Sequence, residues 1–119
     1  HIYSEFIKGP EYDLESTREA IRYCEDFIAL YPQHEEIGKV EALYERMLNA
    51  LATNRVLLAD YYFFNKRDNV AAIIFYNEAI TTAPNSQAAT EAKERLSAIE
   101  MGIRPTTGRN FLKRLLFIR

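Results

Sequence analysis

Hydrophobic residues recur at helical spacing from the first third of the chain onward. In the first such stretch, one face of a helix would carry Ile21, Cys24, Phe27, Ile28 and Tyr31. Ser16 and Glu19 have the spacing of a capping box, in which two side chains satisfy free amides of the first turn. We therefore predict a helix that begins near Ser16 and is stopped by Pro32.

The second stretch predicts one long helix over about residues 34–66. Its apolar positions are Ile37, Val40, Leu43, Tyr44, Met47, Leu48, Leu51, Leu58, Tyr61 and Tyr62. Neither proline nor glycine interrupts the chain between Gly38 and Pro84. At 1.5 Å per residue, this helix would be about 50 Å long.

Two shorter helices follow. Asp68 or Asn69 is expected to break and recap the chain, so that the next helix covers about residues 70–82 before Pro84 closes it. The last helix would open at Ser86 and extend to about Met101.

A helix closed by proline occurs twice. The segment AIRYCEDFIALYP (residues 20–32) aligns without a gap with AIIFYNEAITTAP (residues 72–84). The identical pairs are Ala20 and Ala72, Ile21 and Ile73, Ile28 and Ile80, and Pro32 and Pro84. Such self-similarity is typical of stacked helical repeats, which usually present a surface to another protein.

The second copy matches a tetratricopeptide unit. Ala72, Tyr76 and Ala79 stand where that motif places small, large aromatic and small residues, which let two helices approach and fill the groove between them. The two prolines, at 32 and 84, are 52 residues apart, whereas the usual period is about 34 residues. The excess is about five helical turns, so an elongated helix would keep the same face inward.

These patterns predict an all-α fold, an α-α superhelix of about two tetratricopeptide-like repeats with one elongated helix. Residues 16–102 would form the repeats. Residues 1–15 show no helical period and contain Gly9-Pro10, which indicates a loop or the edge of a preceding repeat. Residues 103–119 would form a basic amphipathic C-terminal helix.

Composition agrees with a domain that needs no crosslinks. Of the 119 residues, 48% are hydrophobic, which is enough for a core. A single cysteine excludes an internal disulfide, and Cys24, in mid-helix, is expected to be a small buried hydrophobe. The sequence has no signal peptide and no run of about 18 apolar residues. Because it starts with His1 and not with methionine, we expect a fragment or a processed chain.

The string LLADYYFFNKRDNVAAIIFYNEAITTAPNSQAATEAKERL resembles the C-terminal half of the BamD (YfiO) family, the tetratricopeptide lipoproteins of the outer-membrane β-barrel assembly machinery. The matching positions are Ala59, Tyr61, Tyr62, Lys66, Arg67, Ala71, Ala72, Pro84, Asn85, Gln87, Ala88 and Ala92. The likeness covers about residues 16–102, and the elongated helix is its most specific part. Two departures are Asp68-Asn69 in place of a glycine and Ala83-Pro84 in place of Tyr-Pro.

The resemblance implies a non-catalytic scaffold on the periplasmic side of the outer membrane. In that family the C-terminal repeats dock on the central barrel subunit and on small accessory lipoproteins, so these are the implied partners. Cys24 does not fit the lipid-bearing cysteine of the family, so the lipid anchor would lie upstream. A generic tetratricopeptide adaptor or co-chaperone remains the alternative among binding proteins.

No catalytic or cofactor motif stands out. The sequence lacks H-x-x-x-H, C-x-x-C, a glycine-rich phosphate loop and a serine elbow, so we expect neither an enzyme nor a cofactor. His34 beside Glu35 and Glu36 comes nearest to a metal site. Adjacent residues at a helix start point in different directions, so a solvated cluster is expected there.

Four aromatic residues in a row end the long helix, namely Tyr61, Tyr62, Phe63 and Phe64. They cover more than half of the helix circumference, so they cannot all face one neighbouring helix. We expect Tyr62 to be the partner contact and the other three to pack between helices.

Basic residues near this helix end are further candidate contacts. Lys66 and Arg67 would either balance the negative end of the helix dipole or meet acidic groups of a partner. Arg95 is a third candidate partner contact.

The C-terminal segment is a separate basic region. Residues 1–102 carry 10 Lys+Arg against 17 Asp+Glu, a balance of −7, whereas residues 103–119 carry five basic residues and no acid. This segment could cap the last repeat, bind a partner protein, or lie on an anionic membrane through Lys113 and Arg114. Nucleic-acid binding is not expected, because the acidic body would repel phosphates.

Overall fold

The computed structural model describes residues 14–102, and in this part of the chain every regular element is a helix, without a strand. The elements are α2 (Leu14–Leu30), α3 (Ile37–Asp60), the π-helical segment η2 (Tyr61–Lys66), α4 (Asn69–Thr82) and α5 (Gln87–Met101). The all-α fold class is therefore confirmed. None of the described helices combines the length and apolar character needed to cross a membrane. The expectations for residues 1–13 and 103–119, including Lys113 and Arg114, lie outside the described residues.

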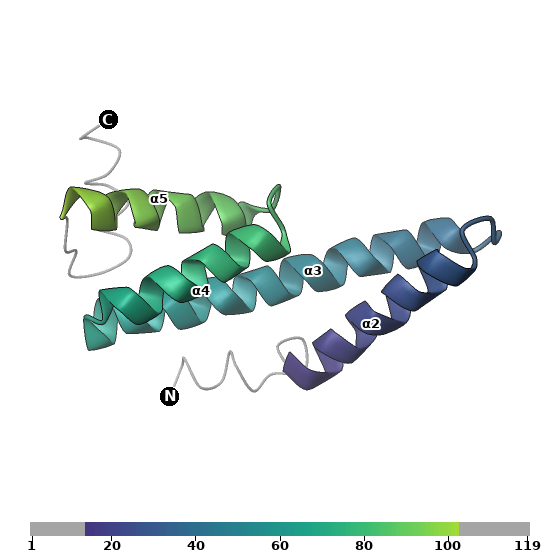
Figure 1. Cartoon of the computed structure of the whole chain (residues 1–119), viewed down its shortest axis with the longest axis horizontal. Coiled ribbons are helices and arrows are strands. Elements are labelled where there is room, and N and C mark those ends of the chain that lie inside the picture. The colour runs from purple at the N-terminus through teal and green to yellow at the C-terminus, as the bar shows by residue number, and fades with distance from the viewer. Residues whose placement is uncertain (1–13, 103–119) are drawn as a thin grey trace.

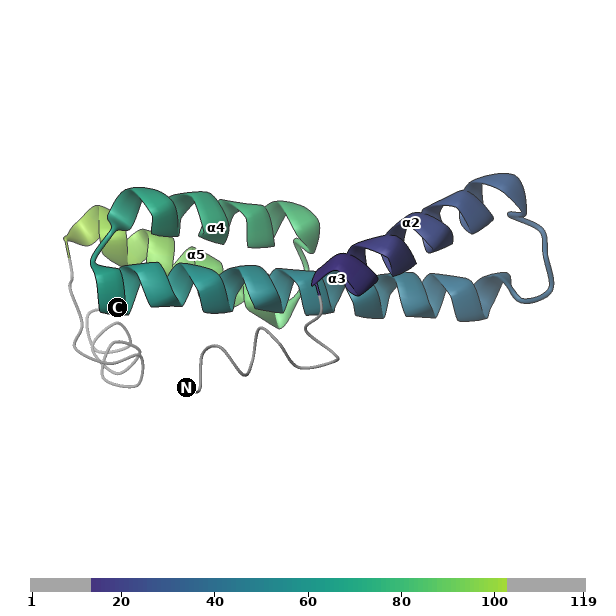
Figure 2. The same ribbon diagram turned by 90° about the horizontal axis from the view of Figure 1, so that it is seen from below.

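The helix formed by α3 and η2 organises the other elements. In Figures 1 and 2, α2 lies along the first half of α3 and α4 lies along its second half. The remaining helix, α5, packs mainly against α4. As a result, the start of α2 and the end of α4 both lie near the middle of α3, and Figure 1 shows them on opposite sides of that helix.

The long helix expected over residues 34–66 is confirmed for most of its length. The α-helical part has 24 residues and passes directly into the six residues of η2. At 1.5 Å per residue this rod is about 45 Å long. It begins only at Ile37 because the preceding residues form turns, in which the amide of Ile37 donates to the carbonyl of His34 (3.0 Å).

The first helix begins earlier than predicted. Ser16 lies inside α2, which already includes Leu14, so the interpretation of Ser16 and Glu19 as a capping box is wrong. Capping was predicted correctly at two later sites. The Asp68 side chain accepts from the amide of Ala71 (3.1 Å) at the start of α4, and Ser86 likewise caps α5.

The two proline-containing turns have the same backbone hydrogen bonds. After α2, the amide of Tyr31 donates to Phe27 (2.8 Å) and that of His34 donates to Tyr31 (3.1 Å). After α4, at positions 52 residues later, Ala83 donates to Ala79 and Ser86 donates to Ala83, both at 3.1 Å. Both helices end two residues before their proline. The sequence likeness of these two segments therefore extends to their local structure.

The core lies where α3, η2, α4 and α5 meet. Its fully buried members are mostly small, and they include Ala52, Ala59, Phe63, Ala72, Tyr76, Ala79, Ala92 and Ala98. Alanines let the helix backbones approach closely, and the two large rings fill the remaining space. The packing roles predicted for Ala72, Tyr76 and Ala79 are confirmed.

The first proline-closed helix packs less completely. Ala20 and Ile28 are half-buried, and Pro32 is exposed in its turn, as is Pro84. Cys24 is fully buried, as predicted, and burial raises the pKa of its thiol.

Candidate functional site: a groove between α2, α3 and α4

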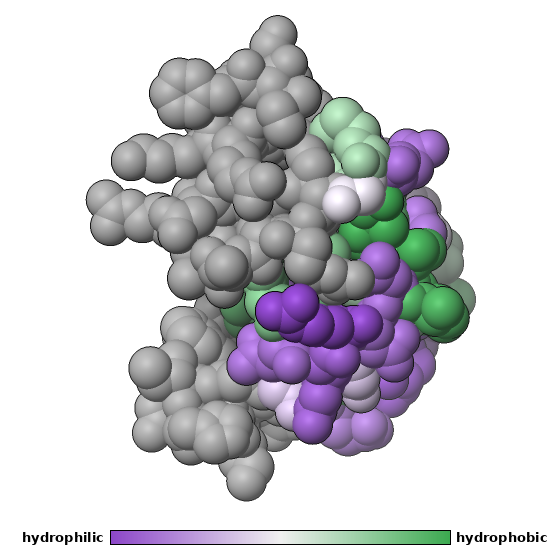
Figure 3. Space-filling view, turned by 90° about the vertical axis from the view of Figure 1, so that its left-hand side faces the viewer, coloured by the Kyte–Doolittle hydropathy of each residue, from purple (hydrophilic) through white to green (hydrophobic). Residues whose placement is uncertain are grey.

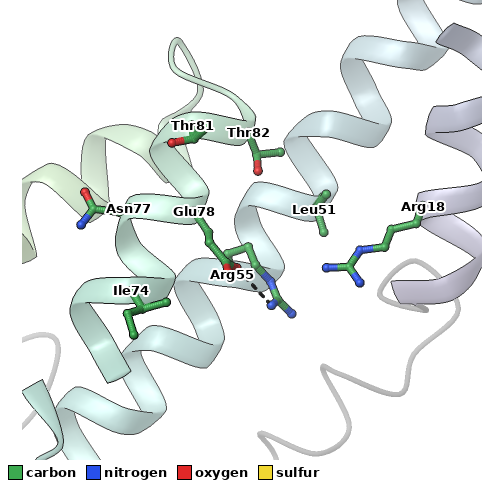
Figure 4. Close-up of a pocket in the computed structure, with 8 residues that line it drawn as sticks. All are labelled: Arg18, Leu51, Arg55, Ile74, Asn77, Glu78, Thr81 and Thr82. Carbon is green, nitrogen blue, oxygen red and sulfur yellow. Dashed lines mark hydrogen bonds and ion pairs between the residues drawn. The ribbon is translucent and has the colours of Figure 1, made fainter. Parts of the chain in front are cut away.

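A groove of about 360 Å³ opens where the start of α2 and the end of α4 approach the middle of α3. Figure 4 shows the side chains around it, which come from all three helices. They are Arg18 from α2, Leu51 and Arg55 from α3, and Ile74, Asn77, Glu78, Thr81 and Thr82 from α4. The groove therefore combines two cations and one carboxylate with neutral hydrogen-bonding groups and two aliphatic side chains.

Arg55 is held in place by several groups. The residue is only 8% exposed, but its guanidinium has polar partners. Its Nε donates to Asn54 Oδ1 (3.1 Å), and its Nη2 donates to the same oxygen. Its Nη1 lies 3.4 Å from Glu78 Oε1. On another side the guanidinium carbon lies 5.4 Å from the centroid of the Phe75 ring, a cation-π contact. Arg55 is thus a fixed positive charge at the edge of the groove.

Arg18 supplies the second positive charge. Its side chain is exposed, and it forms no ion pair with any of the described residues. In Figure 4 the guanidinium groups of Arg18 and Arg55 are directed toward the same open space beside α3. Two consecutive helices, α2 and α3, therefore each place a guanidinium at one groove.

The wall formed by α4 is mixed in character. Asn77 and Thr81 can donate and accept hydrogen bonds. Ile74 is 52% exposed, and Val70, one turn earlier on the same helix, is 71% exposed. An aliphatic strip thus runs along α4 toward the groove, because residues four apart share one helix face.

A second hollow, of about 280 Å³, lies between α3 and the turn from α4 to α5. Its lining includes Leu48, Asn49, Pro84 and Asn85, and Glu45 is its only charged residue. Because it lacks convergent charges, it is the weaker candidate.

Arg95 was predicted to contact a partner, and the structure corrects this. It is 6% exposed, and its Nε lies 2.9 Å from Asp60 Oδ1. The hydroxyl of Tyr76 donates to the same carboxylate oxygen. Arg95 is therefore part of the interior, where it joins α5 to α3 and is not available to another protein.

The groups around Asp60 have shifted pKa values. Burial raises the pKa of the Asp60 carboxyl, against the opposing effects of the Arg95 charge and the Tyr76 hydrogen bond. Burial and the nearby Asp60 charge also raise the pKa of Tyr76, so its hydroxyl keeps its proton and remains a donor. This arrangement is structural, because all three side chains are used to join helices.

Three other predicted contacts, Tyr62, Lys66 and Arg67, lie in η2 or directly after it. Tyr62 is half-buried and stacks on the Phe75 ring, with centroids 5.6 Å apart and an angle of 18° between the planes. Lys66 and Arg67 are exposed, and the Lys66 ammonium lies 5.7 Å from the Tyr61 ring centroid. Figure 3 shows this end of the molecule, where hydrophilic side chains gather beside a hydrophobic area.

Among the four aromatic residues of η2, Phe63 is buried as predicted. Tyr61 and Phe64 are half-buried. The position of Tyr62 leaves its assignment as a partner contact untested, since part of its surface is open but one face of the ring is occupied.

In the part of the chain that the structure describes, no group of three His, Cys, Asp or Glu side chains could hold a metal ion. The imidazole Nδ1 of His34 accepts from the amide of Glu36 (2.9 Å). The Glu36 side chain pairs with Lys39 at 3.1 Å.

The groove was not found from the sequence. Arg18 and Arg55 are 37 positions apart on separate helices, and helical periodicity does not say how two helices are placed. One signal was present, because Arg55 stands between Ala52 and Val56 on the buried side of α3, where a charge needs partners.

No protein-family model, curated protein or solved structure matches this chain.

Proposed function

We propose that this chain is a non-catalytic protein-binding scaffold that resembles the C-terminal part of the outer-membrane β-barrel assembly lipoprotein. In this proposal it belongs to a tetratricopeptide-like protein on the periplasmic side of the outer membrane, anchored by a lipid upstream. Its partners would be the central barrel subunit and accessory lipoproteins.

One observation supports the scaffold function above all. The helices α2 and α4 lie separately along one rod of α3 and η2. Residues of α2, α3 and α4 line an open groove with charged and aliphatic walls. Repeat proteins bind other proteins through such grooves and edges. The matching hydrogen bonds of the two proline turns favour a repeat arrangement as well.

The proposal is tested by a pull-down from detergent-solubilised cell envelopes with this chain as bait. A double charge reversal, Lys66→Glu with Arg67→Glu, alters the exposed basic residues at the end of η2. The matched control, Arg22→Glu with Lys93→Glu, changes the same number of charges at exposed positions on α2 and α5.

We expect the wild type and the control to recover a barrel protein with periplasmic repeats. The double variant should recover at least about fivefold less of it, because charge pairs at a docked surface have effects of this size. Recovery of soluble proteins only would favour the generic adaptor and contradict the assembly function. Equal recovery of the barrel protein by the double variant and the control would show that Lys66 and Arg67 do not contribute to the interface.

A further inference from the structure

We propose that the groove between α2, α3 and α4 binds an extended segment of a partner protein in which an acidic side chain stands beside an aliphatic one. This inference rests on the proposed scaffold function and adds the surface and the chemistry of the bound segment.

The groove and the body around it carry opposite net charges. Residues 14–102 carry nine Lys+Arg and 14 Asp+Glu, so the described body is acidic. Around the groove this balance is reversed, because Arg18 and Arg55 face a single carboxylate, that of Glu78. A net positive groove on a net negative body favours acidic segments at this place and disfavours them elsewhere.

The ion pair within the groove is loose. The distance of 3.4 Å between Arg55 Nη1 and Glu78 Oε1 is longer than the roughly 2.7–2.9 Å of a strong charge-assisted hydrogen bond. The Glu78 side chain is still 46% exposed. Arg18, which is exposed, can therefore receive a carboxylate from outside, with the charge of Arg55 beside it.

Arg55 is held rigidly in the groove. Asn54 holds two nitrogens of Arg55, and the Phe75 ring lies against its guanidinium. The Phe75 ring is itself stacked on the ring of Tyr62 in η2. A cation that is already positioned loses little conformational entropy when a ligand binds, which raises the affinity for that ligand.

The aliphatic part of the segment would lie against α4. Ile74 lines the groove and Val70 continues its face, and both are exposed, so a bound side chain would remove apolar surface from water. Asn77 and Thr81 can meet the backbone of an extended segment, which carries unpaired amides and carbonyls. A volume of about 360 Å³ is at the lower end of the roughly 300–1,000 Å³ typical of ligand pockets, which suits a few side chains.

The test uses fluorescence anisotropy with a labelled ten-residue peptide of alternating leucine and glutamate, and the same peptide with glutamine in place of glutamate. The variant is Arg18→Gln, and the control is Arg22→Gln, one turn later on α2 and outside the groove. Both positions are exposed, so the fold should survive either change.

We expect the glutamate peptide to bind about fivefold more tightly than the glutamine peptide, and Arg18→Gln to lose about that factor, as for an exposed ion pair. Arg22→Gln should bind like the wild type. In ¹⁵N spectra, shifts on binding should centre on Ile74, Asn77 and Thr81.

Three results would overturn the inference: no binding of either peptide, equal affinity for both, or equal losses in Arg18→Gln and Arg22→Gln. The envelope pull-down separates this failure from that of the scaffold function. If Arg18→Gln recovers the barrel subunit as well as the wild type does, the groove inference falls and the scaffold proposal stands. If the wild type recovers no barrel subunit, the scaffold proposal falls.

Discussion

Asp60, Tyr76 and Arg95 come from three different helices, and their polar atoms meet in the interior of the molecule. A carboxylate that is removed from water needs such partners, because an unsatisfied buried charge is costly. The tetratricopeptide pattern explained why a large ring stands at position 76, since the ring fills the space between two helices. It did not explain the hydroxyl, whose partner lies 16 positions earlier on α3.

Replacing Tyr76 with phenylalanine should isolate the role of this hydroxyl. The ring stays, but Asp60 loses a donor, so we expect the free energy of unfolding to fall by about 1–3 kcal/mol in urea denaturation. Tyr23→Phe is the control, because Tyr23 is exposed on α2, and it should change the value by less than about 0.5 kcal/mol. Equal values for the two variants would show that the Tyr76 hydrogen bond does not stabilise the fold.

The raised pKa of Asp60 predicts a pH dependence of stability. The folded state holds the proton more readily than the unfolded state, whose Asp pKa is about 3.9. The contribution of Asp60 is therefore fully present below about pH 3.9 and is lost as the pH rises through the folded-state pKa. The unfolding free energy of the wild type minus that of Asp60→Asn should accordingly decrease with rising pH in this range. An increase instead would mean that the Arg95 charge outweighs burial.

At the scale of elements, the junction between η2 and α4 differs most from the sequence-based expectation. Asp68-Asn69 was expected to stand in for the glycine of the resembling family. The left-handed residue is Arg67, with φ of 54°, while Asp68 is the N-cap of α4. The composition of the turn was thus predictable, but the residue with positive φ was not, because the π-helical turn changes where the helix ends.

Glycine at position 67 should stabilise the protein. A non-glycine residue in the left-handed region costs about 1 kcal/mol, and Arg67→Gly should recover a large part of it in urea denaturation. Lys66→Gly is the matched control inside η2, where glycine should cost about 0.5–1 kcal/mol. A loss of stability in Arg67→Gly as large as in Lys66→Gly would contradict this reading of the turn.

The helices themselves were largely predictable. Proline and capping residues located both ends of α4 and the start of α5 to within one residue, because Asp68 and Ser86 cap these helices and Pro84 follows α4. The end of α5 at Met101 was also predicted, and its C-cap is Gly102 in the left-handed conformation. The beginnings of α2 and α3 were wrong by a few residues. At the start of α2, the residues thought to form a capping box lie inside the helix, since the spacing of Ser16 and Glu19 also occurs within helices.

At the scale of the whole molecule, the continuous rod of α3 and η2 determines where the other helices can lie. Its length was readable from the absence of proline and glycine, but its buried face was not. The apolar positions predicted for it are half-buried, and the buried hydrophobic positions of α3 are Ala52, Val56 and Ala59. The groove depends instead on the angle and offset between α2 and α4, and no local pattern encodes these. This is why Arg95 was predicted to lie at the surface, and why the placement of Arg18 and Arg55 at one groove was not predicted.

We propose above all that this molecule binds another protein through the groove between α2, α3 and α4. A photo-crosslinking residue in place of the exposed Ile74, in cell envelopes, tests it most directly. We predict a crosslink to a barrel subunit with periplasmic repeats, and none from the same residue at Lys93, which lies outside the groove lining. Crosslinks to lipid alone, or equal crosslinking from both positions, would contradict the account.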